Sequence, residues 1–154
     1  MTKPAPRQLP EVNTARPVPT GGWVVFVPPV HPGAGEYFTI NFIIDGGGAE
    51  ITDGIKGDMV VDFACTIINA TLLADQVGSI VVDIWKDVYA SFPPTNADTI
   101  TNVTPPTIAA GTKSQDAALV GWITAIVAGD VLRYNVDSCA TITRCTVALK
   151  VART

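Results

Sequence analysis

Charged side chains are scarce in this sequence of 154 residues. They make up 16% of the chain, against roughly 25% in an average soluble domain. Apolar residues account for 47%, and the mean hydropathy is +0.33. So few charges are typical of a protein that buries part of its surface against other subunits. We therefore expect the chain to assemble with copies of itself or with other proteins.

Long apolar runs are also missing. No run approaches the roughly 20 residues of a membrane-spanning helix, so the sequence predicts no membrane partner. Residues 1–20 carry charges and prolines where an export signal needs an apolar block. The length is that of one domain with a short appendage. We expect synthesis and assembly in the cytoplasm of the producing cell.

Histidine occurs once, as His31 between Val30 and Pro32. A Ser-His-Asp or Cys-His nucleophile would have to use this residue. No carboxylate that could orient its ring stands beside it in the sequence. We interpret it as a surface or interface residue.

Glycoside hydrolysis requires two carboxyl groups at a fixed separation. Four aspartates are candidates for such a pair: Asp75, Asp83, Asp87 and Asp98. The second and third fall at opposite ends of a predicted strand, and the other two fall in predicted turns. A solvated acidic face is the favoured interpretation, so the sequence predicts no catalytic residues and no enzyme.

Metal and phosphate motifs are absent. Asp45, Asp53 and Asp58 offer oxygen ligands, but their spacing is not that of a calcium-binding loop. The glycines at 46–48 lack the Lys-Ser/Thr pair and the helix of a phosphate-binding loop. The sequence therefore predicts no cofactor and no metal.

The cysteines give no zinc pattern, because there are three of them without a CxxC pair. Cys145 alternates with apolar residues and is expected in the core. Reduced thiols are favoured for all three, in keeping with cytosolic synthesis. A bridge between Cys139 and Cys145 stays open as the alternative.

Proline is concentrated in residues 1–22, which hold five of the twelve prolines and predict an extended arm. Lys3, Arg7 and Arg16 against Glu11 give the arm a net charge of +2. The remaining seven basic and thirteen acidic residues give −6. An acidic body argues against a nucleic-acid partner. A disordered tail and an arm that docks on a partner, with Trp23 as an anchor, are equal alternatives.

The rest of the chain, residues 23–154, predicts an all-β fold. Apolar residues alternate at period two, turn residues recur every 8 to 12 positions, and no segment has a helical period. We expect an antiparallel β-sandwich of jelly-roll kind. Residues 95–114 are expected to form a long loop, with one short strand at 99–101. The expected strands are 23–27, 36–45, 49–52, 58–64, 66–73, 78–85, 116–126, 131–137 and 141–152.

The segment 78–95 is the centre of this prediction. Its first half is apolar on both faces, which is typical of a strand in the middle of a covered sheet. Trp85, like Trp122, is expected in the core. The segment leaves the sheet through Tyr89, Phe92, Pro93 and Pro94, which we predict to form an interface or glycan-contact loop.

Four consecutive stretches carry a resemblance to a known family. They are LLADQVGSIVVDIWKDVYASFPPT, ADTIT, LVGWITAIVAGDVLRYNVDS and ITRCTVALKV. Together they make residues 57–154 resemble a module of tailed-bacteriophage virion proteins, found in fibres, collars and capsid decorations. The resemblance implies a β-sandwich, a homotrimer and no catalytic role. It transfers no functional residues.

No fibre shaft precedes the module in this sequence. A short knob with an arm is most similar to a capsid cement or decoration protein, which binds the major capsid protein and stabilises the shell. The resemblance therefore implies a place on the virion. The alternative is a neck or tail fibre tip that binds a host-surface carbohydrate, and a polysaccharide hydrolase is a third and weaker hypothesis.

Overall fold

The computed structural model describes residues 35–154, so the predicted arm, the strand at 23–27 and His31 lie outside the described residues. The described part is built from antiparallel strands and two three-residue 3₁₀ turns, η1 (Tyr89–Ser91) and η2 (Asn96–Asp98). None of its helices has the length and hydropathy needed to cross a membrane. The strands are β1 (Tyr37–Asp45), β2 (Gly54–Val61), β3 (Cys65–Val88), β4 (Thr107–Asp116), β5 (Ala125–Ile126), β6 (Asp130–Ala140) and β7 (Arg144–Arg153).

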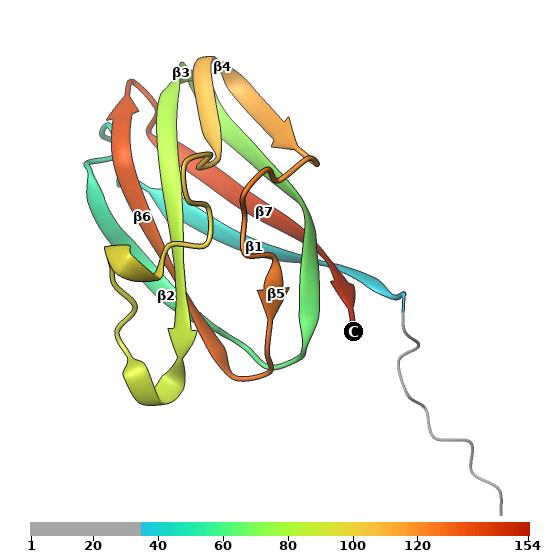
Figure 1. Cartoon of the computed structure of the whole chain (residues 1–154). Helices are drawn as coiled ribbons and strands as arrows, with labels where there is room; N and C mark the ends of the chain where they lie inside the picture. Colours follow the sequence, from blue (N-terminus) through green and yellow to red (C-terminus); the bar gives the residue numbers. More distant parts are fainter. Residues whose placement is uncertain (1–34) are drawn as a thin grey trace, which may run out of the picture. The chain divides into compact units, whose positions relative to one another are not determined.

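Strand β3 runs without a break for 24 residues and belongs to both halves of the fold. Its first half, up to Ala74, pairs with β7, and β7 pairs in turn with β1. Its second half, from Ser79, pairs with β6, and β6 pairs with β2. Figure 1 shows β3 in green and yellow-green passing from one half to the other. The two strands predicted at 66–73 and 78–85 are therefore one bent strand.

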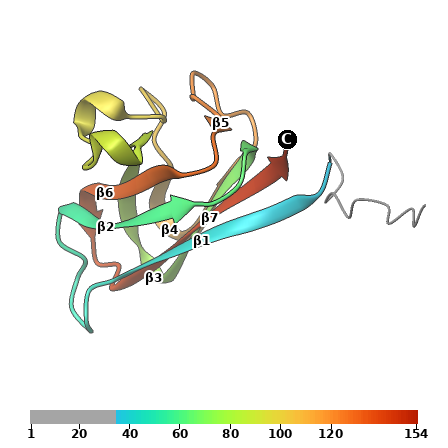
Figure 2. The ribbon, with the colours of Figure 1, turned by 90° about the horizontal axis from the view of Figure 1, so that it is seen from below.

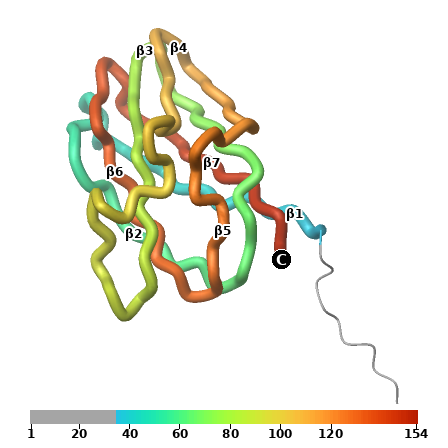
Figure 3. The backbone as a smooth tube through the Cα atoms, in the orientation of Figure 1, coloured from blue at the N-terminus to red at the C-terminus, as the bar shows by residue number. Residues whose placement is uncertain are grey.

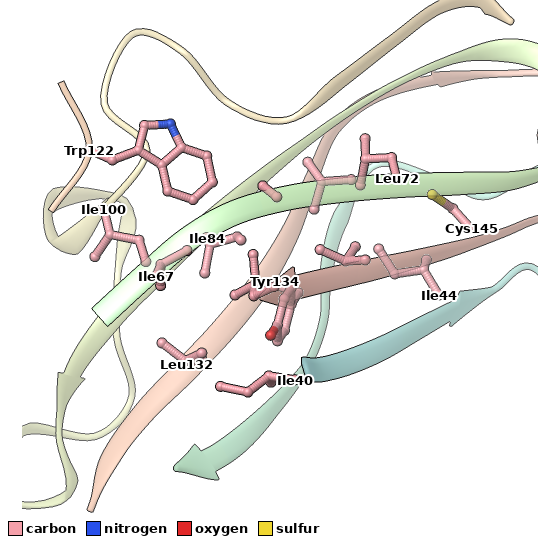
Figure 4. Packing of buried hydrophobic residues seen from close by; sticks show 14 of the residues in the cluster. Ile40, Ile44, Ile67, Leu72, Ile84, Ile100, Trp122, Leu132, Tyr134 and Cys145 are labelled. Carbon is pink, nitrogen blue, oxygen red and sulfur yellow. The ribbon is translucent and has the colours of Figure 1, made fainter. Parts of the chain in front are cut away.

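Alternate residues of these strands point between the two halves and form a single core (Figure 4). The expectation of an antiparallel β-sandwich is confirmed, and its halves are joined through β3 and curl around the core. The Phe42 ring stacks on Tyr134 at 4.1 Å between ring centroids, bringing β1 over the core near β2 and β6. Core residues labelled in the close view are Ile40, Ile44, Ile67, Leu72, Ile84, Ile100, Trp122, Leu132, Tyr134 and Cys145.

The bend in β3 lies at residues 74–77. Pairing with β4 jumps there from Leu73↔Lys113 to Gly78↔Gly111, so β3 has extra residues that its partner lacks. The Asp75 carboxylate accepts hydrogen bonds from the backbone N–H groups of Thr143 (3.2 Å) and Arg144 (3.0 Å). The bend is thereby fixed to the turn between β6 and β7.

The loop predicted at 95–114 and the strand predicted at 116–126, both between β3 and β6, differ from the structure. Strand β4 occupies residues predicted as loop, because it is rich in Thr and Ala and only Ile108 is buried. The strand predicted at 116–126 is mostly a loop, and only β5 at its end is extended. Two of its apolar residues, Leu119 and Trp122, are buried by loop packing: Leu119 is 8% exposed with a φ of +46°. The Asp116 side chain accepts the N–H groups that open this loop.

Residues 49–52 form no strand either. Ile51 is buried, and its N–H donates to the carbonyl oxygen of Ile142 at 2.9 Å. The burial of Ile51 alone therefore accounts for the apolar pattern that predicted a strand in this segment. Figure 3 shows the other long connection, residues 89–106, leaving the end of β3 and running back along it to β4.

Substitution of Gly78 tests the bend. A Cβ at this position would lie 2.4 Å from the carbonyl oxygen of Ala140, closer than real contacts allow. We expect Gly78→Ala to lower the free energy of unfolding by about 1–3 kcal/mol, the usual cost of overpacking. Gly111→Ala is the control, because its Cβ would meet no atom closer than 3.7 Å. Urea unfolding measures both, and equal stability of the two variants would contradict the account.

The pH dependence of stability tests the contacts of Asp75. The Thr143 hydroxyl and the Arg144 N–H donate to the ionised carboxylate and lower its pKa. A carboxyl with a lowered pKa stabilises the fold above its unfolded value of about 3.9, and this contribution is lost as the pH falls through the folded value. Between about pH 6 and about pH 3, the Asp75→Asn protein should therefore lose less stability in urea unfolding than the wild type. An equal loss of stability in the two proteins over this pH range would contradict this expectation.

Candidate interaction surface

The Asp83 side chain fixes the long connection against β3. It is only 6% exposed, and its oxygens accept hydrogen bonds from Trp85 Nε1 (2.6 Å), Thr99 Oγ1 (2.7 Å) and Thr101 Oγ1 (2.5 Å). The threonines come from the connection, and the tryptophan comes from β3 itself. The prediction of a solvated acidic face is wrong at this residue, because its neighbours supply donors that replace water.

The other aspartates considered for a hydrolytic pair have separate local partners. Asp98 completes a capping box with Thr95, whose N–H and hydroxyl donate to it at 2.8 Å and lower its pKa. Asp87 accepts the N–H of Val88 at 2.7 Å, and Asp75 is held at the bend. Both residues predicted in turns lie where the chain turns or bends. Each of these carboxylates therefore accepts hydrogen bonds from its own neighbouring residues.

An apolar hollow opens beside the residues that follow β3. Its volume is about 270 Å³. Tyr89 and Phe92 form one wall and are 77% and 49% exposed. The other wall is the outer surface of β2 and the start of β6. The lining residues are Asp58, Met59, Val60, Tyr89, Phe92 and Val131.

Arg133 on β6 holds the aromatic wall in place. Its Nε and one terminal nitrogen donate to the two oxygens of Asp58 at 2.6 and 3.0 Å, and this ion pair raises the pKa of the guanidinium. Another nitrogen donates to the carbonyl oxygen of Pro94 at 3.2 Å. The guanidinium carbon also lies 5.3 Å from the centre of the Phe92 ring. One side chain thus joins β2, β6 and the loop.

The structure shows which residues of the predicted contact loop are exposed. Tyr89, Phe92 and Pro93 are exposed, as a contact loop requires. Pro94 is buried, and it contributes its carbonyl oxygen to Arg133 in place of a contact surface. The predicted arm residues Lys3, Arg7, Arg16 and Trp23 lie outside the described residues.

Asp58 and Arg133 were missed as site residues. The alternating pattern placed each on an outward face, and the structure confirms this placement. Their importance follows from the register, in which they are directly opposite on β2 and β6. Opposite charges at such a pair attract each other, and a bulge between Ile55 and Gly57 sets the register.

A second apolar surface lies on the loops before β4 and β5. Val103, Val120 and Ile123 are 90%, 66% and 52% exposed. The two loops are joined by hydrogen bonds, including Thr104 Oγ1 to the Val120 carbonyl (2.6 Å) and Trp122 Nε1 to the Thr104 carbonyl (3.0 Å). Trp122 and Trp85 are buried, as predicted. Val103, Val120 and Ile123 therefore project from two loops that are fixed to each other by hydrogen bonds.

The cysteines are unpaired thiols. Cys65 and Cys145 are buried in the core, and burial raises the pKa of both, that of Cys145 to about 11. Cys139 is half-buried, with its thiol 3.6 Å from the Ile142 carbonyl. Within residues 35–154, no group of three His, Cys, Asp or Glu side chains is arranged to hold a metal ion.

The lining of the hollow is largely apolar. Its lining has one carboxylate, Asp58, and both of its oxygens are engaged by Arg133. The remaining lining side chains are apolar or aromatic, which suits contact with an apolar protein surface or the face of a ring. No known family model matches the chain, and comparison with curated protein sequences gives no match.

The Arg133–Asp58 pair can be tested by a double-mutant cycle. Arg133→Lys keeps the charge but loses the two-pronged contact, and Asp58→Asn removes the opposite charge. Because the pair is partly exposed, we expect a coupling free energy of about 1 kcal/mol. Urea unfolding of the wild type, both single variants and the double variant measures it. Strictly additive effects would contradict the role given to Arg133.

Proposed function

We propose that this protein is a non-enzymatic structural protein of a phage virion, a homotrimeric cement protein that binds the major capsid protein and stabilises the shell. The observation that carries the proposal is the resemblance of residues 57–154 to a virion module. The all-β sandwich fits this role, since it supplies a rigid body with exposed loops.

The apolar hollow is the proposed contact with the capsid. Aromatic side chains at the centre of an interface commonly contribute much of its binding free energy. Tyr89 and Phe92 are large, exposed and held by a fixed loop, so little conformational entropy is lost when they bind. The Asp58–Arg133 pair beside them provides a polar rim.

The surface of Val103, Val120 and Ile123 is the proposed contact between the three copies. These side chains are the kind that subunit interfaces bury, and their loops are fixed to each other by hydrogen bonds. Burial here and at the hollow accounts for the low charge content of the sequence.

The basic arm, residues 1–22, is the proposed second contact with the shell. Its charge of +2 suits an acidic surface on the partner protein. Three arms on one trimer reinforce one another through effective concentration even when each binds weakly. We therefore expect binding to weaken as the salt concentration rises.

Co-sedimentation with capsids that lack the protein tests the proposal. The wild type should be a trimer by light scattering and should pellet with capsids. A Tyr89→Ser/Phe92→Ser variant should bind at least about tenfold more weakly, the effect of removing an aromatic hot spot. Val77→Ser is the matched control, because Val77 is 66% exposed at the β3 bend, away from both surfaces.

Two further variants separate the contacts. Substitution of Lys3, Arg7 and Arg16 by Glu should weaken capsid binding while the protein stays trimeric. Val120→Asp/Ile123→Asp should give folded monomers. A wild type that is monomeric, or that does not bind capsids, would overturn the proposal.

A second candidate function is a fibre tip that binds a host carbohydrate. The observation that favours it is the pairing of the exposed rings of Tyr89 and Phe92 with the Asp58–Arg133 pair, because sugar faces stack on aromatic rings while polar groups bind hydroxyls. Glycan-array binding that Tyr89→Ser abolishes, without capsid binding, would favour this function. Turnover of a host polysaccharide would contradict both proposals.

A further inference from the structure

The outer edge of β1 is open in the described part of the chain. β1 pairs with β7 through nine consecutive residues without a register shift, and within residues 35–154 no strand pairs with its other side. Its sequence has no proline and one charged residue, Asp45 at its end. Figure 2 shows β1, in cyan, at the rim of the sheet. Natural proteins normally cover or interrupt such an edge; β2, at the opposite end of the strand order, has a bulge and Lys56.

The hydrogen bonds to β7 show which backbone groups lie at this open edge. Arg153 N donates to the Glu36 carbonyl, and Gly46 N donates to the Thr143 carbonyl. Residues along an antiparallel pair alternate between bonded and non-bonded positions, so the even-numbered residues of β1 bond β7. The backbone N–H and C=O groups of the odd-numbered residues in 37–45 therefore point to the open edge.

The side chains of the same odd-numbered residues lie on the outer face of the sheet, and all five are exposed. Tyr37 and Ile43 are each 62% exposed. Lys150, from the neighbouring strand β7, places its Nζ 5.0 Å from the centre of the Tyr37 ring. The edge of β1 thus offers a further strand both backbone hydrogen bonds and side-chain contacts on this face.

We propose that β1 pairs with β1 of a second copy of this chain, antiparallel and about a twofold axis at Asn41. In this register every residue from 37 to 45 has a partner, and odd-numbered residues oppose odd-numbered residues, as their outward backbone groups require. A shift of one residue would oppose outward and inward groups. A shift of two residues would leave both ends of the strand unpaired.

The strand is complementary to itself in this register. The two Asn41 side chains meet at the axis, where each amide can both donate and accept a hydrogen bond. Tyr37 of one copy lies opposite Asp45 of the other. Because the Lys150 ammonium lies over Tyr37, it faces Asp45 of the second copy, and opposite charges meet at both ends of the contact. This match of charges favours a second copy over an unrelated strand.

The contact is small. One pair of strands is expected to bury less than the about 1,600 Å² of a typical stable interface, so we expect association only at high protein concentration. The contact uses none of the residues proposed above for the capsid or the trimer. Its failure would therefore leave those proposals standing, and their failure would leave this one standing.

Amide hydrogen exchange of the full-length protein at two concentrations tests the pairing. At about 1 mM protein, the N–H groups of Thr39, Asn41 and Ile43 should exchange at least about fivefold more slowly than after dilution by about a hundredfold. Phe38 and Ile40 are internal controls and should stay slow at both concentrations, because their N–H groups bond β7. Equal exchange of the three outer amides at both concentrations would overturn the proposal.

Proline at the axis tests the register. Asn41→Pro removes an outward N–H without taking a bond from β7, and proline is tolerated at such an edge position. In concentrated solution, the amides of Thr39 and Ile43 should exchange at least about fivefold faster in this variant than in the wild type. Slow exchange at Phe38 and Ile40 shows that the variant is folded. Asn41→Thr, which keeps the N–H, is the matched control. Unaltered protection in Asn41→Pro would overturn the proposal.

Charge-swapped variants separate a second copy from a segment of the same chain. Asp45→Lys and Lys150→Asp each place like charges at both ends of the twofold contact. Each variant alone should therefore lose protection of the outer amides by about threefold or more. An equimolar mixture restores opposite charges at both ends and should recover the protection. A mixture that exchanges as the average of its two components would overturn the assignment of this edge to a second copy.

Discussion

The fold depends on one constraint, that a single strand serves both halves of the sandwich. β3 can do so only if it bends sharply at residues 74–77, and the bend needs Gly78 because any side chain would meet the β6–β7 turn. Asp75 fixes the same turn from the other side. The relative placement of the two halves, and hence the core between them, follows from this local geometry.

The residues that follow the end of β3 are also held in place by specific contacts. Asp83 and Trp85 hold the long connection against the sheet from within, and Arg133 holds its aromatic residues from outside. Tyr89 and Phe92 thus lie on a loop that is held by contacts within the chain. A surface of this kind is suited to binding another surface, and its lining offers no unengaged carboxylate for catalysis.

The sequence was most informative where one face of a strand is buried. Alternation correctly predicted β6 and β7, because each buries every second residue over most of its length. It failed for β4, which buries one apolar residue, and for the loop after it, where Leu119 and Trp122 are buried without being part of a strand. The exposure of Tyr89 and Phe92 was predicted from their position at the exit from the strand. Asp83 and Arg133 depend on contacts between distant segments, which no local pattern contains.

The described residues expose apolar surfaces at the hollow and at the loops before β4 and β5. The central claim is that both belong to a capsid-bound trimer. The most direct test is the number of copies in the purified virion, measured by quantitative mass spectrometry. A shell protein at repeated three-fold positions requires on the order of hundreds of copies, in a multiple of three. About a dozen copies or fewer, as in a neck or tail ring, would contradict the claim.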